Sequence, residues 1–436
     1  MRAAMNDHAV SAFASTSSAA TTSHVDDLCR RARPAARVVS LLPTARRQEA
    51  LQAAADALTA AAPEILAANV RDVDQGRKDG LSNALIDRLR LDAKRLDGVI
   101  ADLRAVAELP DPVGQVLESR TIALGIQATK LSVPIGVVAI IFESRPNVTV
   151  DTAALCLMSG NACILRGGKE AAHSNLALAT AFRAGLEQAR VPADAVQLVA
   201  LPDRALIAAL LKRDDALDLV VPRGGEALIR HVVEVSRVPV IKHDKGVCSL
   251  YVHTAADQAM ALQLIENAKC QRPAVCNAIE NVLVDAAIAA AFLPRLAATL
   301  TPKGVELRAD ERALPFLPGA KPATEADWST EYGELILAVK TVDDLAEAIA
   351  FTQQYGSHHS DGIITADAAA AEAYLAQIDS ACVYHNASTR FTDGGLFGFG
   401  AEVGISTNRV HARGPMGLRE LCTYKWVCRG SGQVRP

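Results

Sequence analysis

Short apolar runs alternate with longer amphipathic segments from Gly136 onward, and this alternation restricts the fold more than any other feature of the chain. The runs 136–143, 162–168, 195–200 and 217–225 have the length of strands and are apolar at consecutive positions. Strands covered on both faces have this continuous character, and helices between them are typical of parallel sheets. We therefore predict a parallel sheet of the Rossmann type, which a further run at 238–244 extends.

The same pattern resumes in the second half of the chain. The 436 residues exceed the roughly 250–300 at which a single hydrophobic core stops growing, so a second domain is expected. Helical segments separate five further runs of strand length, at 249–254, 280–285, 335–340, 361–365 and 381–386. The class is α/β in both halves.

The N-terminal part has a different pattern. Residues 25–109 are rich in Ala and Leu, with charges three and four positions apart, which predicts helices. Residues 1–24 are rich in Ala, Ser and Thr and lack an apolar stripe, so we expect a disordered leader. A transit peptide is the alternative, although the segment is poor in Arg. Residues 121–134 alternate like an exposed strand or ribbon.

The amino acid composition limits the kinds of binding partner and the cellular location that we expect. The formal net charge of −4 gives no electrostatic reason to expect nucleic acid or an anionic membrane as the main partner. No apolar run reaches the ~18–20 residues that a membrane-spanning helix needs. The nine cysteines form no CxxC pair and no Cys/His metal spacing, so we expect no metal site. Scattered thiols favour a reducing, cytoplasmic location.

Cys276 is the strongest candidate nucleophile. It lies in QRPAVCNAIE, between a predicted helix that ends near Cys270 and a predicted strand that begins near Glu280. A cysteine nucleophile needs thiolate character, which a nearby cation or oriented N–H groups supply. Arg272 and Asn277 are close in sequence. A buried, inert cysteine is the alternative that the residues alone leave open.

Asn147 and Arg145 follow the first Rossmann strand, where ligands of α/β folds bind. The Asn147 amide is suited to stabilising the oxyanion that forms when a thiolate attacks an acyl carbon. Capping of the next helix is its alternative role. The Arg145 guanidinium is suited to binding phosphate, with a surface ion pair as the alternative.

Two further sites on this domain are candidates for cofactor binding. After the second strand, Arg166 and Lys169 favour a ribose 2′-phosphate, and therefore NADP over NAD, although Glu170 competes. Gly224 and Gly225 precede a predicted helix, so their N–H groups could face a pyrophosphate. A solvated lysine and a simple turn are the alternatives.

Three motifs carry a family resemblance: IFESRPN at 141–147, QRPAVCN at 271–277 and TRFTDGGLFGFGAEVGIST at 389–407. With them the chain resembles the γ-glutamyl phosphate reductases, a family of the aldehyde dehydrogenase superfamily, from about Asp26 to Val427. The resemblance implies a Rossmann-like NADP-binding domain, an α/β catalytic domain and a small oligomerisation flap. We place the NADP-binding domain at 25–118 and 134–253, the catalytic domain at 254–403, and the flap at 119–133 and 404–436.

The resemblance also implies the reaction. The family reduces L-glutamate 5-phosphate to L-glutamate 5-semialdehyde and phosphate with NADPH, through a cysteine thioester, as the second step of proline biosynthesis from glutamate. Cys276 matches its nucleophile, and Glu331 matches the glutamate that holds the nicotinamide ribose, with Glu334 as its rival. A homo-oligomer and transient contact with a separate glutamate 5-kinase are expected. For the amino acid end of the substrate, the candidate residues are Asn386, Ser388, Thr389 and Arg390, with a purely structural glycine loop as the alternative.

One departure from the superfamily bears on the chemistry. Hydrolytic aldehyde dehydrogenases carry a water-activating glutamate in an ELGG motif, whereas this chain has KHDKGVCS at 242–249. A thioester that reacts with phosphate needs no such base. The segment therefore favours acyl-phosphate chemistry over two alternatives, a hydrolytic dehydrogenase and a binding protein without catalysis.

Overall fold

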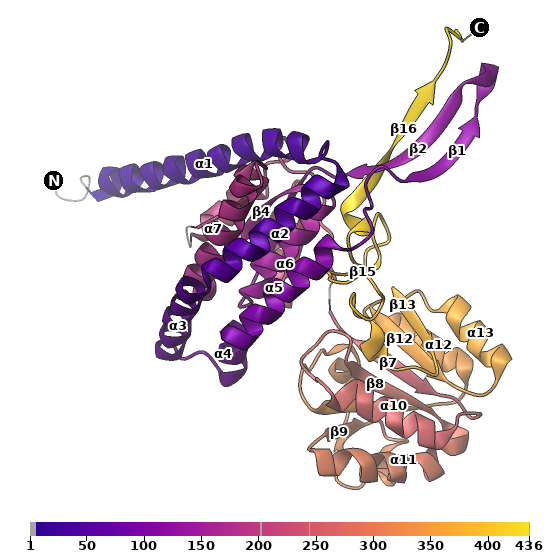
Figure 1. The fold of residues 1–436 in the computed structure, drawn as a ribbon. Helices are drawn as coiled ribbons and strands as arrows, with labels where there is room; N and C mark the ends of the chain where they lie inside the picture. Colours follow the sequence, from indigo (N-terminus) through magenta and orange to yellow (C-terminus); the bar gives the residue numbers. More distant parts are fainter. Residues whose placement is uncertain (1–5, 201–202, 244, 436) are drawn as a thin grey trace. The chain divides into compact units, whose positions relative to one another are not determined.

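The structure is a computed structural model in which residues 6–200, 203–243 and 245–435 are described (Figure 1). The chain divides into two compact units. Unit 1 consists of Met1–Ile241, Gly398–Gly404 and Met416–Pro436, and unit 2 of Lys242–Phe397 and Ile405–Pro415. No helix in the described part of the chain combines the length and apolarity needed to cross a membrane.

The centre of unit 1 is a parallel sheet of four strands in the order β5-β4-β3-β6. Every residue of the central strand β3 is buried, as its continuous apolar sequence predicts. Strands β4 and β6 flank β3, and the order corresponds to the first four strands, 3-2-1-4, of a Rossmann sheet. The bounds are β3 (Val137–Phe142), β4 (Ala162–Arg166), β5 (Val196–Leu198) and β6 (Leu219–Arg223).

The prediction of a strand at 238–244 is wrong. The described part of this segment forms one isolated parallel bridge, between Val220 and Val240. Val220 donates to the carbonyl of Pro239, and Ile241 donates to the carbonyl of Val220. Pro239 has no N–H group, so the ladder cannot continue toward the N-terminal side of the bridge.

Helices surround this sheet in unit 1, and the predicted helical character of residues 25–109 is confirmed. Asp92 and Asp203 cap their helices by accepting a hydrogen bond from an N–H of the first turn. The helices are α1 (Asn6–Val39), α2 (Thr44–Ala60), α3 (Ala62–Lys78), α4 (Asn83–Leu89), α5 (Ala93–Ala107), α6 (Asn147–Met158), α7 (Ala172–Gln188), α8 (Arg204–Leu210) and α9 (Glu226–Val235).

The structure has a helix over much of the segment expected as a disordered leader. Residues 1–5 of that leader lie outside the described residues, and α1 begins at Asn6. The alanines of the segment have the highest intrinsic helix propensity of any residue, which gives a physical reason for a helix without an apolar stripe.

A separate antiparallel sheet in unit 1 joins strands from distant parts of the chain, in the order β1-β2-β16 (Figure 1). Its strands are β1 (Val116–Thr121), β2 (Gln127–Pro134) and β16 (Cys422–Arg429). The Lys130 ammonium lies 3.7 Å from the centre of the Tyr424 ring, so a cation–π contact links β2 to β16. These strands bring together the two segments expected to form the oligomerisation flap, whose role stays a prediction.

Unit 2 contains a parallel sheet of seven strands in the order β10-β9-β11-β8-β7-β12-β13. One apolar cluster joins α10 and α11 to the sheet, and a second cluster joins α12 and α13 to it. The strands are β7 (Cys248–Val252), β8 (Ile279–Asp285), β9 (Glu306–Ala309), β10 (Lys321–Pro322), β11 (Ile336–Val342), β12 (Ser360–Ile364) and β13 (Cys382–His385). The helices are α10 (Gln258–Cys270), α11 (Ala286–Leu300), α12 (Leu345–Tyr355) and α13 (Ala368–Gln377).

The boundaries of the two units differ from the domain boundaries that we expected from the sequence. Strand β7 was expected at the end of the NADP-binding domain, but it pairs with β8 and β12 in the sheet of unit 2. The segment Gly398–Gly404 belongs to unit 1, and Ile405–Pro415 belongs to unit 2. Strands β14 (Gly404–Ser406) and β15 (Gly414–Met416) form a two-stranded sheet.

Helix α7 packs against α2 with its backbone in close contact, and this contact gives a stability prediction. A Cβ atom at Gly185 would lie 2.4 Å from the Ala54 Cα and 2.6 Å from the Ala53 oxygen. We predict that Gly185→Ala lowers the free energy of unfolding by about 1–3 kcal/mol, as overpacking usually does. Denaturant titration provides the measurement.

The matched control is Gly98→Ala in α5, where nothing lies within 4 Å of the added Cβ. That change should stabilise the protein by roughly 0.5–1 kcal/mol, because alanine restricts the unfolded chain and favours helix. Equal effects of the two substitutions would contradict the packing argument.

Candidate active site

Cys276 lies in unit 2, in the loop between α10 and β8, and is half-buried. The backbone of Gly246 approaches this loop so closely that a Cβ atom there would lie 2.4 Å from the Cys276 oxygen and 2.5 Å from its Cα. A glycine is therefore required at this position, although Gly246 does not have a positive φ. The segment that replaces the hydrolytic ELGG motif thus contacts the backbone of the candidate nucleophile.

Residues of two other segments hold the loop that carries Cys276. The thiol of Cys248 donates to the Cys276 carbonyl, with 3.2 Å between sulfur and oxygen. The Asn277 amide donates to the Thr392 carbonyl at 2.8 Å, and the Thr389 hydroxyl donates to the Asn277 carbonyl at 2.7 Å. Residues 389–392 therefore lie against the Cys276 loop. The two motifs QRPAVCN and TRFTDGG are thus in contact.

Arg390 lies across the same loop. Its Nε donates to the Gln271 side-chain oxygen at 3.0 Å, and a terminal nitrogen contacts the Asn277 side-chain oxygen. Burial and the nearby Arg272 guanidinium lower the pKa of Arg390, whereas the Cys276 thiolate acts in the opposite direction. Two arginines and the candidate nucleophile are therefore within electrostatic range of one another.

Asn386 and Ser388 have structural partners. Asn386 has a φ of 53°, and its amide both donates to the Thr365 carbonyl and accepts from the Thr365 N–H. The Ser388 hydroxyl accepts from the Arg390 N–H at the start of a 3-10 turn. These bonds fix the backbone on both sides of Thr389, and a substrate role for Asn386 and Ser388 stays a prediction.

Glu331 is placed near the nucleophile loop. Its carboxylate accepts a hydrogen bond of 2.9 Å from the N–H of Gly246, the residue that contacts the Cys276 backbone. This position near the Cys276 loop favours Glu331 over Glu334 as the glutamate expected to contact the nicotinamide ribose.

A buried ion pair supports the turn that carries Glu331. The Lys269 ammonium lies 2.5 Å from the Glu280 carboxylate, and both side chains are fully buried. Glu280 also accepts from the Gly333 N–H at 3.3 Å. Burial lowers the pKa of Lys269 and raises that of Glu280 to about 7. Sequence reasoning missed this pair, because two charged residues in apolar segments reveal their contact only in space.

A second buried polar group lies behind the loop. The chain of contacts runs from the Tyr384 hydroxyl to the Thr392 hydroxyl at 2.7 Å, to Ser360 at 2.7 Å and to His359 at 2.9 Å. His359 is fully buried, and burial lowers its pKa to about 3, so it is neutral near pH 7. Because Thr392 also binds the Asn277 amide, this network adds rigidity to the nucleophile loop. The polar residues in HHSDG gave a signal that the sequence analysis did not use.

Asn147 is the first residue of α6 in unit 1, and the structure gives its amide a partner. Its Nδ2 donates to the Asp151 carboxylate at 2.8 Å. Burial raises the pKa of Asp151 to about 7, despite this hydrogen bond. Since an amide nitrogen carries two hydrogens, the bond to Asp151 fixes the side chain and leaves the second N–H to donate elsewhere. Sequence reasoning missed Asp151, although the spacing of four residues on a helix predicts the contact.

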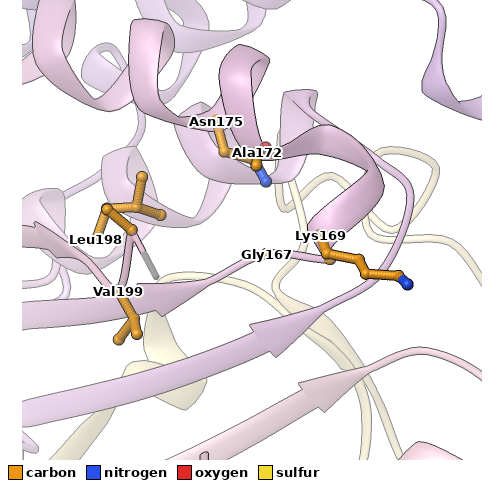
Figure 2. A pocket seen from close by; sticks show the side chains of 8 residues that line it. Gly167, Lys169, Ala172, Asn175, Leu198 and Val199 are labelled. Carbon is orange, nitrogen blue, oxygen red and sulfur yellow. The ribbon is translucent and has the colours of Figure 1, made fainter. Parts of the chain in front are cut away.

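A small hollow lies beyond the ends of β4 and β5 in unit 1. Gly167, Gly168, Asn175 and Val199 are among the residues that line it. Figure 2 shows Lys169 at this hollow, with its side chain extending away from Leu198 and Val199. Gly167 leaves room for Asn175, since a Cβ there would lie 2.0 Å from the Asn175 amide nitrogen. The glycines, the amide and the exposed lysine suit the adenosine end of a dinucleotide.

Glu170, the acidic competitor of Lys169, has other partners. Its carboxylate accepts from the N–H and from the hydroxyl of Ser144, both at 2.7 Å. Arg166 is buried and donates to the Gly167 carbonyl at 2.9 Å, so at least part of its guanidinium stabilises its own loop. Lys169 is therefore the cation in this motif with the more exposed side chain.

A carboxylate lies at the start of α9. The Glu143 side chain accepts from the Gly225 N–H at 2.9 Å, and a Cβ on Gly224 would lie 2.4 Å from the same carboxylate oxygen. The helix N-terminus is thus already bound to an anionic group, as its dipole favours. Contact of Gly224 and Gly225 with a cofactor stays a prediction and requires Glu143 to move.

The sequence and the structure were compared with known proteins. The sequence model of the aldehyde dehydrogenase family matches residues 3–312. The chain is 51% identical over 420 residues to γ-glutamyl phosphate reductase of Hyphomonas neptunium, covering 96% of this chain and 98% of that protein. It is 49% identical over 414 residues to the enzyme of Desulforamulus reducens, covering 95% and 100%.

A solved structure agrees with the sequence comparisons. The crystal structure of γ-glutamyl phosphate reductase from Thermotoga maritima is 44% identical, with a TM-score of 0.93, over 94% of this chain and all of that chain. The α/β fold and the supported cysteine loop thus define an oxidoreductase of the aldehyde dehydrogenase class. Within that class, the chain belongs to the γ-glutamyl phosphate reductase family.

The ionisation of Asp151 gives a testable pH effect. Its pKa of about 7 in the folded protein lies above the ~3.9 of an unfolded aspartate, so the folded state binds more protons between these values. The contribution of Asp151 to stability is therefore present below pH 4 and is lost as the pH rises through 7. The charged groups that influence it are Asp102 and Arg223, and the hydrogen-bond donor is Asn147.

We predict that Asp151→Asn gains stability relative to the parent protein as the pH is raised from 5 to 8. Urea denaturation of both proteins at several pH values measures the difference in free energy of unfolding. A difference that is constant with pH would show that Asp151 is already ionised at pH 5.

Proposed function

We propose that this protein reduces L-glutamate 5-phosphate to L-glutamate 5-semialdehyde and phosphate with NADPH, as the second step of proline biosynthesis from glutamate. Relatives that are about 50% identical over nearly the full chain are named γ-glutamyl phosphate reductase, and this name supports the proposed substrate and reaction. The observation that carries the proposal is the rigid Cys276 loop, which is held by Gly246, Cys248 and Thr392 and flanked by two arginines.

In the proposed reaction the Cys276 thiolate attacks the acyl carbon. The bond from that carbon to the phosphate oxygen breaks, and a thioester remains on the protein. The Asn147 amide donates to the oxyanion that forms in this step, where one such donor typically lowers the barrier by ~3–4 kcal/mol. Asp151 orients that amide. A nicotinamide cofactor held by Arg166, Lys169 and Glu331 would supply the hydride that reduces the thioester. The Cys276 sulfur then leaves the former acyl carbon as the thiolate.

Five residues are assigned to substrate binding. We assign the phosphate or the acyl region to Arg145, and the amino acid end to Asn386, Ser388, Thr389 and Arg390. The hydrogen bonds of Thr389 and Arg390 with Asn277 support the position of this segment beside the nucleophile.

The preference for NADP rests on the β4–α7 connection. Lys169 is exposed beside the hollow, whereas one carboxylate oxygen of Glu170 already accepts from both the N–H and the hydroxyl of Ser144. Arg166, Gly224 and Gly225 complete the proposed cofactor site, and Glu331 holds the nicotinamide ribose.

A hydrolytic dehydrogenase is the competing function. In the 242–249 segment Gly246 is packed on the Cys276 backbone, and the segment contains no glutamate that could activate water. Glu331 accepts from the Gly246 N–H, which favours a supporting role for its carboxylate. These observations favour phosphate over water as the group exchanged with the thioester.

The family resemblance suggests the protein partners, and the state of the cysteines suggests the cellular location. We propose a homo-oligomer built through the β1-β2-β16 sheet, and transient contact with a separate glutamate 5-kinase. Each of the nine cysteines is a free thiol in the structure. Free thiols agree with a reducing, cytoplasmic location.

Single-turnover oxidation of the semialdehyde tests the function. Without inorganic phosphate, NADP⁺ and L-glutamate 5-semialdehyde should yield one equivalent of NADPH per active site and then stop, because the thioester has no acceptor. Addition of phosphate should restart turnover. Absorbance at the NADPH band measures both phases.

Cys276→Ser is the control for this experiment. It should retain NADPH binding but produce no burst, because a serine hydroxyl at this position lacks an activating base. NADPH that accumulates over many turnovers without phosphate would instead identify a hydrolytic enzyme.

Lys169→Glu tests the cofactor preference. It removes a cation and introduces repulsion toward a 2′-phosphate, so the Kd for NADPH should increase by about tenfold or more, while the Kd for NADH changes less. Fluorescence titration of both nucleotides measures the ratio. Equal losses for the two cofactors would place Lys169 away from the ribose phosphate.

A further inference from the structure

The loop that carries Cys276 is closed at its base by a buried ion pair. This loop connects the end of α10 at Cys270 with the start of β8 at Ile279. The Lys269 ammonium lies 2.5 Å from the Glu280 carboxylate and donates to the Ile279 carbonyl at 3.0 Å. Because Lys269 precedes the loop and Glu280 follows it, these contacts fix the distance between the two ends of the loop.

The same pair holds the turn that carries Glu331. Glu280 accepts from the Gly333 N–H at 3.3 Å, and Gly333 has a φ of 62°, which a glycine adopts without strain. The Lys269 ammonium lies 6.0 Å from the centre of the Tyr332 ring, a position in which an ammonium and an aromatic ring attract each other. Both members of the pair therefore contact this turn as well as the base of the loop.

The turn leads back to the nucleophile through Gly246. The Glu331 carboxylate accepts from the Gly246 N–H at 2.9 Å, and a Cβ atom on Gly246 would lie 2.5 Å from the Cys276 Cα. The contacts thus form a closed ring, because the loop that begins and ends at the ion pair is also packed against Gly246. A displacement of the turn would move the acceptor of the Gly246 N–H, and with it the segment that contacts Cys276.

Stability alone is a weak reason for a charged pair at this place. Both side chains are fully buried, and the neighbouring Ala268 and Ile279 belong to an apolar core cluster of unit 2. Taking two charges out of water is costly, and apolar residues of similar volume often give equal or greater stability. What an apolar pair could not supply is the donor to the Ile279 carbonyl and the acceptor for the Gly333 N–H.

We propose that Lys269 and Glu280 are positioning residues, which hold Cys276 and Glu331 in a fixed relation to each other while the thioester forms and is reduced. The proposal rests on the proposed function and deepens it by adding two residues that act through the cysteine loop and the Glu331 turn. A displacement of reacting groups by about 1 Å can cost about a hundredfold in rate. The pair should therefore affect the rate of the chemical steps more than the affinity for the substrate.

The decisive variant is Lys269→Met combined with Glu280→Met, which removes both polar groups and keeps a similar volume. It should fold, but its NADPH burst in semialdehyde oxidation without phosphate should be about tenfold to a hundredfold slower than that of the parent. The semialdehyde concentration that gives half the maximal burst rate should stay near the parent value. In the cofactor-free variant, amides of 271–278 and 331–335 should exchange faster with deuterium, because they lose the support of the pair.

Two single variants and a control complete the experiment. Lys269→Met removes the donor to Ile279 and should slow the burst even if the double variant does not fold, since burial favours the protonated carboxyl of Glu280 once the ammonium is absent. Glu280→Gln keeps an acceptor for the Gly333 N–H and should retain more of the burst rate than Lys269→Met. Ile265→Val removes a buried methyl group from α10 and leaves the pair intact, so it should lower stability but keep the parent burst rate.

The outcomes separate the positioning role from the function. A parent enzyme that gives no burst, or that turns over without phosphate, would overturn the proposed function itself. If the parent gives the burst, a folded double variant or a folded Lys269→Met with the parent burst rate would overturn the positioning role alone. So would a higher half-saturating concentration of semialdehyde at an unchanged maximal rate, because the pair would then serve substrate binding. Equal slowing in Ile265→Val would attribute the loss to stability and would also overturn the role.

Discussion

The contact between Gly246 and the backbone of Cys276 is the constraint on which the candidate site in unit 2 depends. No side chain fits between these segments, so the loop can pack only where residue 246 is a glycine. The contact also leaves the Gly246 N–H to Glu331 and places Cys248 where its thiol reaches the Cys276 carbonyl. The 242–249 segment therefore positions the backbone of Cys276, the candidate nucleophile, and also contains no glutamate.

Rigidity at this loop comes from buried polar groups, which are costly to bury singly but stabilising when all partners are present. The Lys269–Glu280 pair supports the turn before β11 through the Gly333 N–H. The Ser360 and Thr392 hydroxyls lie behind Asn277. Apolar residues of the same size would fill the space, but they would not form the hydrogen bonds that hold the Gly333 N–H and the Thr392 carbonyl.

The sequence predicted the fold because its signals are local. Continuous apolar runs such as 137–142 marked buried strands, and the order of strands and helices determined a parallel sheet. The run at 238–244 looked the same, but Pro239 removes the N–H that a further ladder bond needs. The edges of the domains were also less predictable, since β7 joins unit 2 through pairing with β8 and β12, residues distant in sequence.

Motifs in the sequence supplied candidate site residues, whereas contacts that depend on a partner in space could not be predicted. Cys276 and Lys169 stand out in QRPAVCN and RGGKE, but nothing in the chain indicates that Ser144 binds Glu170 or that Glu143 caps α9. Both contacts involve acidic residues that sequence reasoning treats as free charges. A hydrogen bond does not remove the charge of either carboxylate, so an anionic cofactor at the start of α9 would require Glu143 to leave the Gly225 N–H.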